Sequence, residues 1–141
     1  MANSTAVSVQ FKVDSMTAIL PAAISTLKAA LYLVSATTNG SNTAYTATGE
    51  SSGTGYTAGG VAVTAATAPA ASGTNAIWTP TASIVYTTIT PPSAVDTIMI
   101  YDTARSSKAI GTWNFGSQTI TAGTLTLTMP ANAVGTALLQ C

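Results

Sequence analysis

Hydrophobic and polar residues alternate at the start of the chain. The apolar positions are Val7, Val9, Phe11 and Val13. A period of two residues predicts a half-buried strand. Across residues 16–27 the apolar positions are instead three and four apart, as on one face of a helix, and Ser15 is placed to cap it. Because Pro21 would break or kink that helix, we predict one short helix here.

From residue 27 onward the pattern predicts β-strands. A continuous apolar run at residues 30–34 is typical of a strand buried on both faces, and alternation resumes at 61–65. Runs rich in β-branched and aromatic residues predict four more strands, at 84–89, 98–101, 109–115 and 124–129. Thr, Ser, Asn and Gly dominate residues 35–60, which we interpret as one long loop, and 66–76 as another loop.

Short strands separated by turn residues favour an antiparallel fold. We therefore predict an all-β protein, an antiparallel β-sandwich or jelly-roll-like barrel with one short helix near the N-terminus. Residues 1–26 would form an N-terminal arm of one strand and the helix. Residues 27–141 would form a β-sandwich domain that carries the long loop at 35–60.

Ionisable side chains are sparse. The 141 residues include four basic and four acidic side chains, 6% of the chain, whereas about 25% is usual. Such a surface is either hydrated by Ser and Thr hydroxyls or covered by other subunits, and we expect both. Four scattered cations cannot form the basic stripe that binds nucleic acid, nor attract an anionic membrane. We therefore predict neither partner.

The glycine-rich stretch GESSGTGYTAGG at residues 49–60 contains a match to the dinucleotide-binding pattern G-x-G-x-x-[GA], at residues 53–58. In nucleotide-binding folds these glycines open a helix, and an acidic residue follows about 20 positions later. Here a strand pattern follows, and no acidic residue lies between Glu50 and Asp96. We therefore expect the glycines to permit positive φ and close backbone approach, and we predict no cofactor.

Groups suited to catalysis are few. The chain has no histidine, which excludes His-dependent triads and removes the commonest transition-metal ligand. The four carboxylates do not cluster in the sequence as a calcium loop would require, and Asp96 and Asp102 are typical turn residues. The four are Asp14, Glu50, Asp96 and Asp102. We therefore predict that the chain is not an enzyme and has no catalytic, cofactor-binding or metal-binding residues.

Several apolar and aromatic side chains, with the C-terminal thiol, are candidates for contact with other molecules. Tyr56 would be an anchor at a packing junction or an exposed contact. Trp78 is interpreted as a core or interface anchor in preference to a sugar-binding platform with Trp113. The single cysteine, Cys141, excludes an intrachain disulfide and is either free or a link between subunits. The full candidate set is Val7, Val9, Phe11, Tyr45, Tyr56, Trp78 and Cys141.

Several stretches resemble a group of small virion proteins of tailed bacteriophages. They are LKAALYLV, TGESSGTGYTAGGVAVT, IMIYDT, AIGTWNFG and ITAGTLTLTMPA, in the order expected for that group. The loop pattern Glu-x-Ser-Gly-x-Gly-Tyr-x-x-Gly-Gly is the most specific of them. The resemblance covers residues 27–130, whereas residues 1–26 and the ending NAVGTALLQC depart from it. It implies a structural role without catalytic residues.

We accordingly expect a capsid decoration, or cement, protein on the virion surface, made in the host cytoplasm because no secretory leader is evident. It would associate with itself, as a homotrimer, and with the major capsid protein, and would stabilise the shell against genome pressure. One alternative is a tail or fibre protein that contacts the host surface through Tyr45, Tyr56 or Trp78. The other is a carbohydrate-binding or adhesin module.

Overall fold

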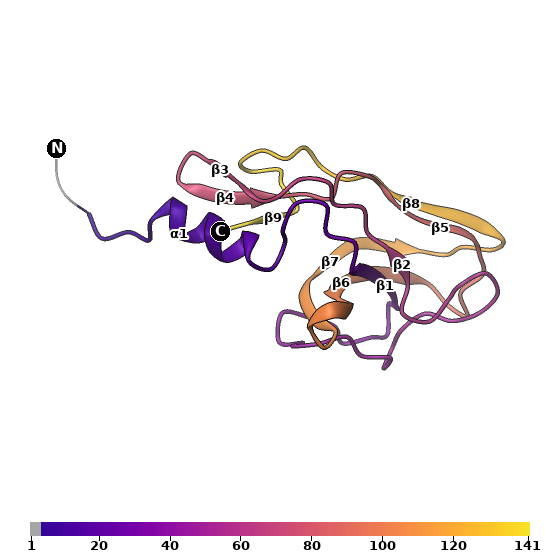
Figure 1. Cartoon of the computed structure of the whole chain (residues 1–141). Coiled ribbons are helices and arrows are strands. Elements are labelled where there is room, and N and C mark those ends of the chain that lie inside the picture. The colour runs from indigo at the N-terminus through magenta and orange to yellow at the C-terminus, as the bar shows by residue number, and fades with distance from the viewer. Residues whose placement is uncertain (1–3) are drawn as a thin grey trace. The chain divides into compact units, whose positions relative to one another are not determined.

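The computed structural model describes residues 4–141 of the chain. The fold is mostly β, with antiparallel sheets and one α-helix near the N-terminus, which confirms the predicted fold class (Figure 1). The chain divides into two compact units with interleaved segments. Unit 1 comprises Met1–Ile24, Thr64–Ala82 and Thr128–Cys141, and unit 2 comprises Ser25–Val63 and Ser83–Leu127. The domain boundary predicted after residue 26 stays a prediction.

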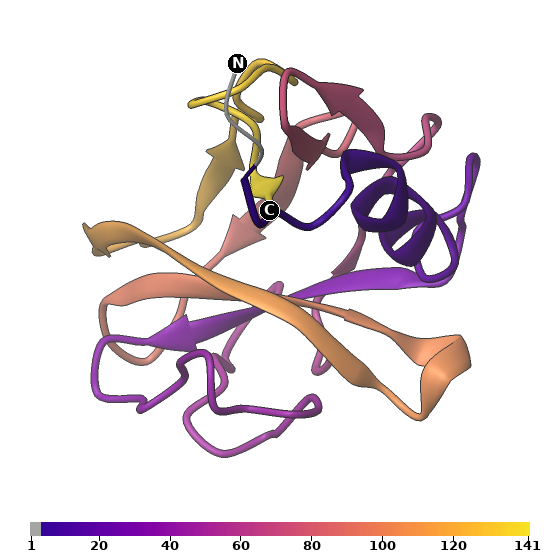
Figure 2. The ribbon, with the colours of Figure 1, turned by 90° about the vertical axis from the view of Figure 1, so that its left-hand side faces the viewer.

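Unit 2 contains two antiparallel sheets. The larger sheet has the order β2-β1-β6-β7 of hydrogen-bonded neighbours, and Figure 2 gives a second view of it. Its strands are β1 (Leu27–Leu33), β2 (Val61–Ala62), β6 (Val95–Asp102) and β7 (Lys108–Gln118), with the short helix η1 (Thr103–Arg105) before β7. The smaller sheet pairs β5 (Ile84–Ile89) with β8 (Gly123–Leu127). The Tyr86 hydroxyl of β5 donates to the Ala29 carbonyl of β1 at 2.8 Å, which links the two sheets in a sandwich-like arrangement.

Burial explains why the strands of unit 2 were predictable. Residues 29–32 of β1 are all 0% exposed, so the strand is covered on both faces and its apolar run is continuous. The prediction at 84–89 coincides with β5, and those at 98–101 and 109–115 lie inside β6 and β7. In β8, half-buried leucines alternate with exposed threonines, as predicted for a strand with one covered face.

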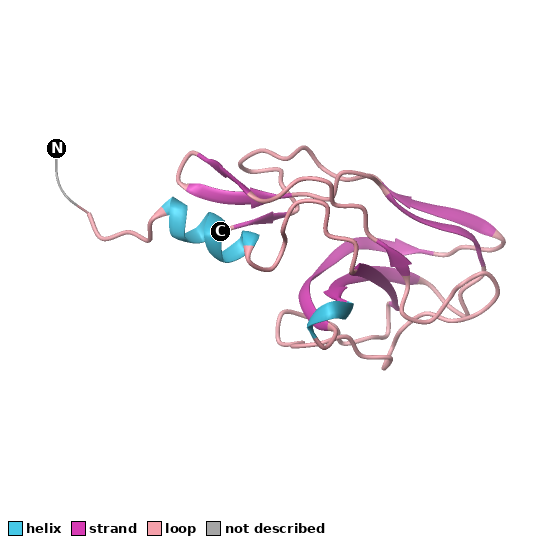
Figure 3. Cartoon of the chain, in the orientation of Figure 1, coloured by secondary structure: helices cyan, strands magenta, loops and turns pink. Residues whose placement is uncertain are grey.

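Unit 1 combines the helix α1 (Val9–Thr17) with a three-stranded sheet of order β3-β4-β9 (Figure 3). Its strands are β3 (Ala70–Ser72), β4 (Asn75–Trp78) and β9 (Leu139–Gln140). The helix packs against β3 and β4. The loop predicted at 66–76 is therefore wrong in part, because it contains β3 and the start of β4. Each strand is too short to show a clear alternation, and β4 is completed by pairing with β9 from the other end of the chain.

The strand predicted over residues 7–13 is wrong, and the helix begins earlier than predicted. Val9, Val13 and Met16 share one face of α1, because these residues are four and three positions apart. Met16 and Leu20 are buried, whereas Phe11 is 67% exposed, so the core selects the helical repeat and not the alternation. Ser15 lies within the helix and donates to the Phe11 carbonyl, and Ser8 occupies the N-cap position.

Candidate functional site

Residues 34–60 join β1 to β2 and contain the glycine-rich motif. They form isolated bridges but no named strand. The carboxylate of Glu50 lies at the centre of this loop and accepts three hydrogen bonds. The Tyr56 hydroxyl at 2.7 Å and the Gly59 backbone N–H at 2.6 Å donate to Oε1, and the Tyr45 hydroxyl at 2.5 Å donates to Oε2. We call Glu50, Tyr45, Tyr56 and Gly59 the Glu50 network.

The backbone beside Glu50 is held against β1. Leu33 donates its N–H to the Gly49 carbonyl at 3.0 Å, and Ser51 donates its N–H to the Leu31 carbonyl at 2.7 Å. The Leu31 N–H donates in turn to the Tyr56 hydroxyl at 3.0 Å. The loop therefore satisfies backbone groups of β1 that lie beyond the short strand β2, and a buried edge needs such partners.

The other tyrosines support the network. The Tyr45 and Tyr101 rings stack with centroids 4.8 Å apart, and the Tyr101 hydroxyl donates to the Gly59 carbonyl at 2.8 Å. The Tyr32 hydroxyl donates to the Thr46 carbonyl at 2.7 Å. The Tyr86 ring lies 6.1 Å from that of Tyr56. Each of the five tyrosines of the chain therefore donates a hydrogen bond either to this loop or to the backbone of β1.

Burial raises the pKa values of all five phenols above the ordinary value of 10, so they stay neutral to still higher pH. Burial raises the pKa of Tyr32 to about 12. Burial first, and then the hydrogen bond to Glu50, raises the pKa of Tyr45 and of Tyr56 well above the ordinary value. Neutral phenols are hydrogen-bond donors, so the tyrosines can hold the carboxylate throughout the physiological pH range.

Three glycines of the motif allow the loop to approach the strands. Gly53, Gly55 and Gly60 have φ of +96°, +80° and +78°, which L side chains rarely adopt. A Cβ at Gly60 would overlap the Ala29 carbonyl, and a Cβ at Gly53 or Gly55 would overlap a carbonyl at the end of β5. These glycines therefore serve positive φ and close approach, as predicted, and they lead into the strand β2 instead of a helix.

The carboxylates are engaged in local structure. Both oxygens of Glu50 accept hydrogen bonds within the loop. Asp102 is buried, accepts from the Thr26 hydroxyl at 2.6 Å and caps η1 through the Ala104 N–H at 2.9 Å. Asp14 accepts from Gln10, and Asp96 accepts from Thr97. Within residues 4–141 no group of three or more His, Cys, Asp or Glu side chains could hold a metal ion.

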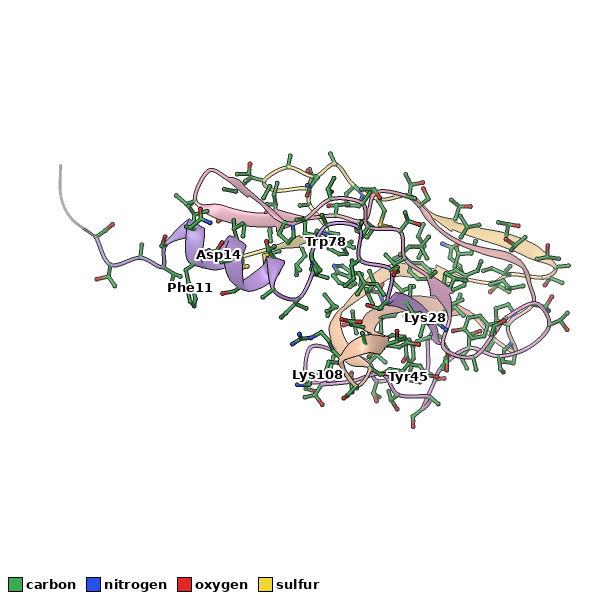
Figure 4. All side chains as sticks on the ribbon, in the orientation of Figure 1. Phe11, Asp14, Lys28, Tyr45, Trp78 and Lys108 are labelled. Carbon is green, nitrogen blue, oxygen red and sulfur yellow. The ribbon has the colours of Figure 1, made fainter. Side chains whose placement is uncertain are left out.

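The structure brings two of the candidate contact residues together. Tyr45 and Tyr56 meet at Glu50, and their hydroxyls are used there. Val7 is 60% exposed, Phe11 projects from α1 into the open, and Val9 is half-buried (Figure 4). Trp78 is 0% exposed and belongs to the core, so its ring is covered and cannot serve as a sugar platform. No described residue accepts a hydrogen bond from its Nε1.

Cys141 is exposed and directly follows β9, the strand that pairs with β4. Its backbone N–H and carbonyl both pair with Ala76 at 3.0 Å. Its thiol lies 3.4 Å from the Met16 sulfur of α1. The C-terminal residue is therefore fixed to unit 1, with its sulfur near the surface.

Sequence reasoning missed Glu50 as the organising residue, because it weighed this carboxylate only for catalysis and for metal binding. A signal was present. Glu50 is the one charged residue between Lys28 and Asp96, and it lies among tyrosines and glycines. An isolated charge in such a segment indicates a carboxylate that is satisfied by neutral donors.

Comparison of the chain with protein-family models, with curated proteins and with solved structures finds no match. The part of the chain that the structure describes has no helix of the length and apolarity needed to cross a membrane. Fold and site together define a small antiparallel β protein with a long loop organised around a hydrogen-bonded carboxylate.

Proposed function

We propose that this chain is a structural protein of a tailed-phage virion that decorates the capsid surface and stabilises the shell. The observation that carries the proposal is the use of Glu50. The one acidic side chain of the motif that resembles virion proteins accepts hydrogen bonds inside the fold, from Tyr45, Tyr56 and Gly59. A carboxylate with both oxygens occupied by structural donors holds a loop in shape, which suits a protein whose work is binding.

The sparse charge of the exterior supports the same role. Of the eight charged side chains, Glu50 and Asp102 are turned into the fold, which leaves six for an accessible surface of 7363 Å². Such a surface makes contacts through apolar groups, hydroxyls and backbone, and salt screens these contacts little. Val7 and Phe11 add exposed apolar area on unit 1.

The mechanism is the addition of binding free energy. Each copy contacts neighbouring capsid subunits and associates with further copies, as a homotrimer. Anything that binds the assembled shell and not its dissociated subunits raises the stability of the shell by mass action.

The test uses capsids assembled from the major capsid protein encoded in the same genome. We expect saturable, stoichiometric binding of the purified chain and a higher temperature of capsid disruption in its presence. Light scattering of the free chain measures its molar mass in solution, which should be that of a trimer. Binding to purified tails and not to capsids would contradict the proposal, as would no effect on capsid disruption.

A further inference from the structure

The long loop between β1 and β2 carries an Asn-Gly pair in an exposed turn. Asn39, Gly40 and Ser41 are all exposed, and the Asn42 N–H donates to the Asn39 carbonyl at 3.1 Å, which closes the turn. Asn-Gly is favoured in turns. It is also the pair in which the backbone nitrogen attacks the preceding side-chain amide most readily, because glycine has no Cβ to obstruct the approach. The turn is therefore a candidate site of modification.

The side-chain amide of Asn39 is held by hydrogen bonds at both ends. Its Oδ1 accepts from the Ser41 N–H at 2.8 Å and from the Ser41 hydroxyl at 2.6 Å. Its Nδ2 donates to the Thr37 carbonyl at 3.1 Å. Two donors on one carbonyl oxygen stabilise the negative charge that develops there when a nucleophile adds to the carbon, as in an oxyanion hole. The Asn39 amide is therefore oriented and polarised for attack at Cγ.

The Gly40 nitrogen is the nucleophile that the turn supplies. It is joined to the Asn39 side chain through the backbone, so the attack is intramolecular, which greatly raises the effective concentration of the nucleophile. A Cβ built at Gly40 would meet nothing within 4 Å, so the space beside the nitrogen is open. Within residues 4–141 no group accepts a hydrogen bond from the Gly40 N–H. Solvent can therefore take its proton.

We propose that Asn39 converts spontaneously to aspartate and isoaspartate in the folded chain, with Ser41 as the donor that assists the reaction. The Gly40 nitrogen loses its proton to solvent and forms a bond to Cγ of Asn39. The Cγ–Nδ2 bond breaks, and the amide nitrogen leaves as ammonia. Water then opens the succinimide at either of its carbonyl carbons, which gives aspartate or isoaspartate. The only co-reactant is water, and no oxidant or reductant takes part.

Asn114 provides a comparison within the same chain. It is exposed, and its Oδ1 accepts from the Gly116 N–H at 2.9 Å, the same spacing as between Asn39 and Ser41. Phe115 follows it in place of a glycine, and no hydroxyl of the described residues donates to its Oδ1. Asn114 should therefore keep its amide under conditions in which Asn39 loses its own.

Conversion changes the charge and the shape of the turn. The formal net charge of the chain at pH 7 is zero, so one new carboxylate makes it negative. A carboxylate at residue 39 cannot donate to the Thr37 carbonyl, and an isoaspartate adds a methylene to the backbone of the turn. The modification therefore gives the long loop a second acidic group beside Glu50, and ion-exchange chromatography can separate the product from the unmodified chain.

The test incubates the purified chain at neutral and at mildly alkaline pH in water enriched in heavy oxygen. Cleavage after Lys28 and Glu50 releases residues 29–50, and fragmentation in the mass spectrometer assigns the mass gain to Asn39 or Asn42. Incorporated heavy oxygen shows that the conversion occurred during the incubation, and an isoaspartate methyltransferase measures the isoaspartate. Asn114 is measured in the same digest.

Three variants separate the roles of the neighbouring residues. Gly40→Ala adds a Cβ beside the nucleophile, and Ser41→Ala removes the hydroxyl that donates to Oδ1 but keeps the N–H. Thr43→Ala is the matched control, since it removes an exposed hydroxyl from the same loop, and the structure shows a contact only for the Thr43 carbonyl. Urea midpoints establish that each variant is folded.

We expect Asn39 to convert progressively, and faster at the higher pH, because the attacking nitrogen must lose its proton. Gly40→Ala should slow the conversion by about tenfold or more. Ser41→Ala should slow it by up to about tenfold, less than the loss of a buried oxyanion donor, because water can replace an exposed hydroxyl. Thr43→Ala should convert at the rate of the unsubstituted chain.

Two results would overturn the proposal. If Asn39 keeps its amide for as long as Asn114 does, the turn is not a modification site. If Ser41→Ala converts as fast as the unsubstituted chain or faster, the hydrogen bonds to Oδ1 restrain the amide and do not assist its attack. Neither result depends on whether the chain binds capsids.

Discussion

Substitution of Gly60 by alanine should destabilise the chain more than substitution of any exposed glycine. At φ of +78° an alanine costs about 1–2 kcal/mol. Its Cβ would also overlap the Ala29 carbonyl, and relieving that overlap costs about 1–3 kcal/mol. The same carbonyl accepts the Tyr86 hydroxyl, so its displacement leaves a buried donor unsatisfied, at about 1–3 kcal/mol.

These terms give a loss of about 3–8 kcal/mol, a large part of the 5–15 kcal/mol typical of a domain. Two glycines of unit 2 separate the contributions. Gly116 has φ of +88° with nothing within 4 Å of a Cβ, so its alanine variant should lose only the conformational term, about 1–2 kcal/mol. Gly40 has neither constraint, and its variant should change stability by less than about 0.5 kcal/mol.

The assay is urea unfolding at neutral pH, followed by tryptophan fluorescence and by far-ultraviolet circular dichroism. Because the chain has two compact units, the two signals must coincide before one free energy of unfolding is assigned. We expect Gly40→Ala to be the most stable of the three variants, Gly116→Ala to be less stable, and Gly60→Ala to be the least stable. A Gly60→Ala variant that loses no more than Gly116→Ala would refute the close approach of the loop to β1.

Two further predictions concern Glu50 and the buried Tyr32. Glu50→Gln keeps the shape of the side chain but removes the charge and the acceptor for Tyr45. Urea unfolding should show a loss of about 2–4 kcal/mol, with the exposed Asp14→Asn as a control that changes little. High pH should also unfold the chain. The pKa of Tyr32 is raised in the fold to about 12, so its contribution is complete below the unfolded pKa of 10 and is lost between pH 10 and 12, up to about 3 kcal/mol. Phenolate absorbance should rise together with unfolding, and titration of all tyrosines near pH 10 without unfolding would contradict the burial.

The sequence allowed prediction of the strands that are buried on both faces or alternate over five residues or more. β1 and β6 are buried on both faces, and β8 alternates over its five residues. The N-terminal segment was predicted wrongly, because Val9 and Val13 fit both a strand and a helix, and only the burial of Met16 and Leu20 decides between them. β3 and β9 are three and two residues long, so their pairing depends on partners that no local pattern reveals.

The site was predictable in its backbone and not in its side chains. A motif dense in glycine indicates positive φ and close approach, and Gly53, Gly55 and Gly60 show both. The partners of Glu50 come from residues five to nine positions away in a segment without regular structure. No helical or strand period relates such positions, so the convergence of the tyrosines on one carboxylate follows only from the folded loop.

The geometry of residues 49–60 separates positions that hold the loop from positions that face outward. Glu50, Tyr56 and the glycines of this stretch hold the loop to the two sheets of unit 2, whereas Thr54, Thr57 and Ala58 face outward. Substitutions at the outward positions should therefore leave the stability of the chain nearly unchanged, whereas substitutions of Glu50, Tyr56 or Gly60 should destabilise the loop.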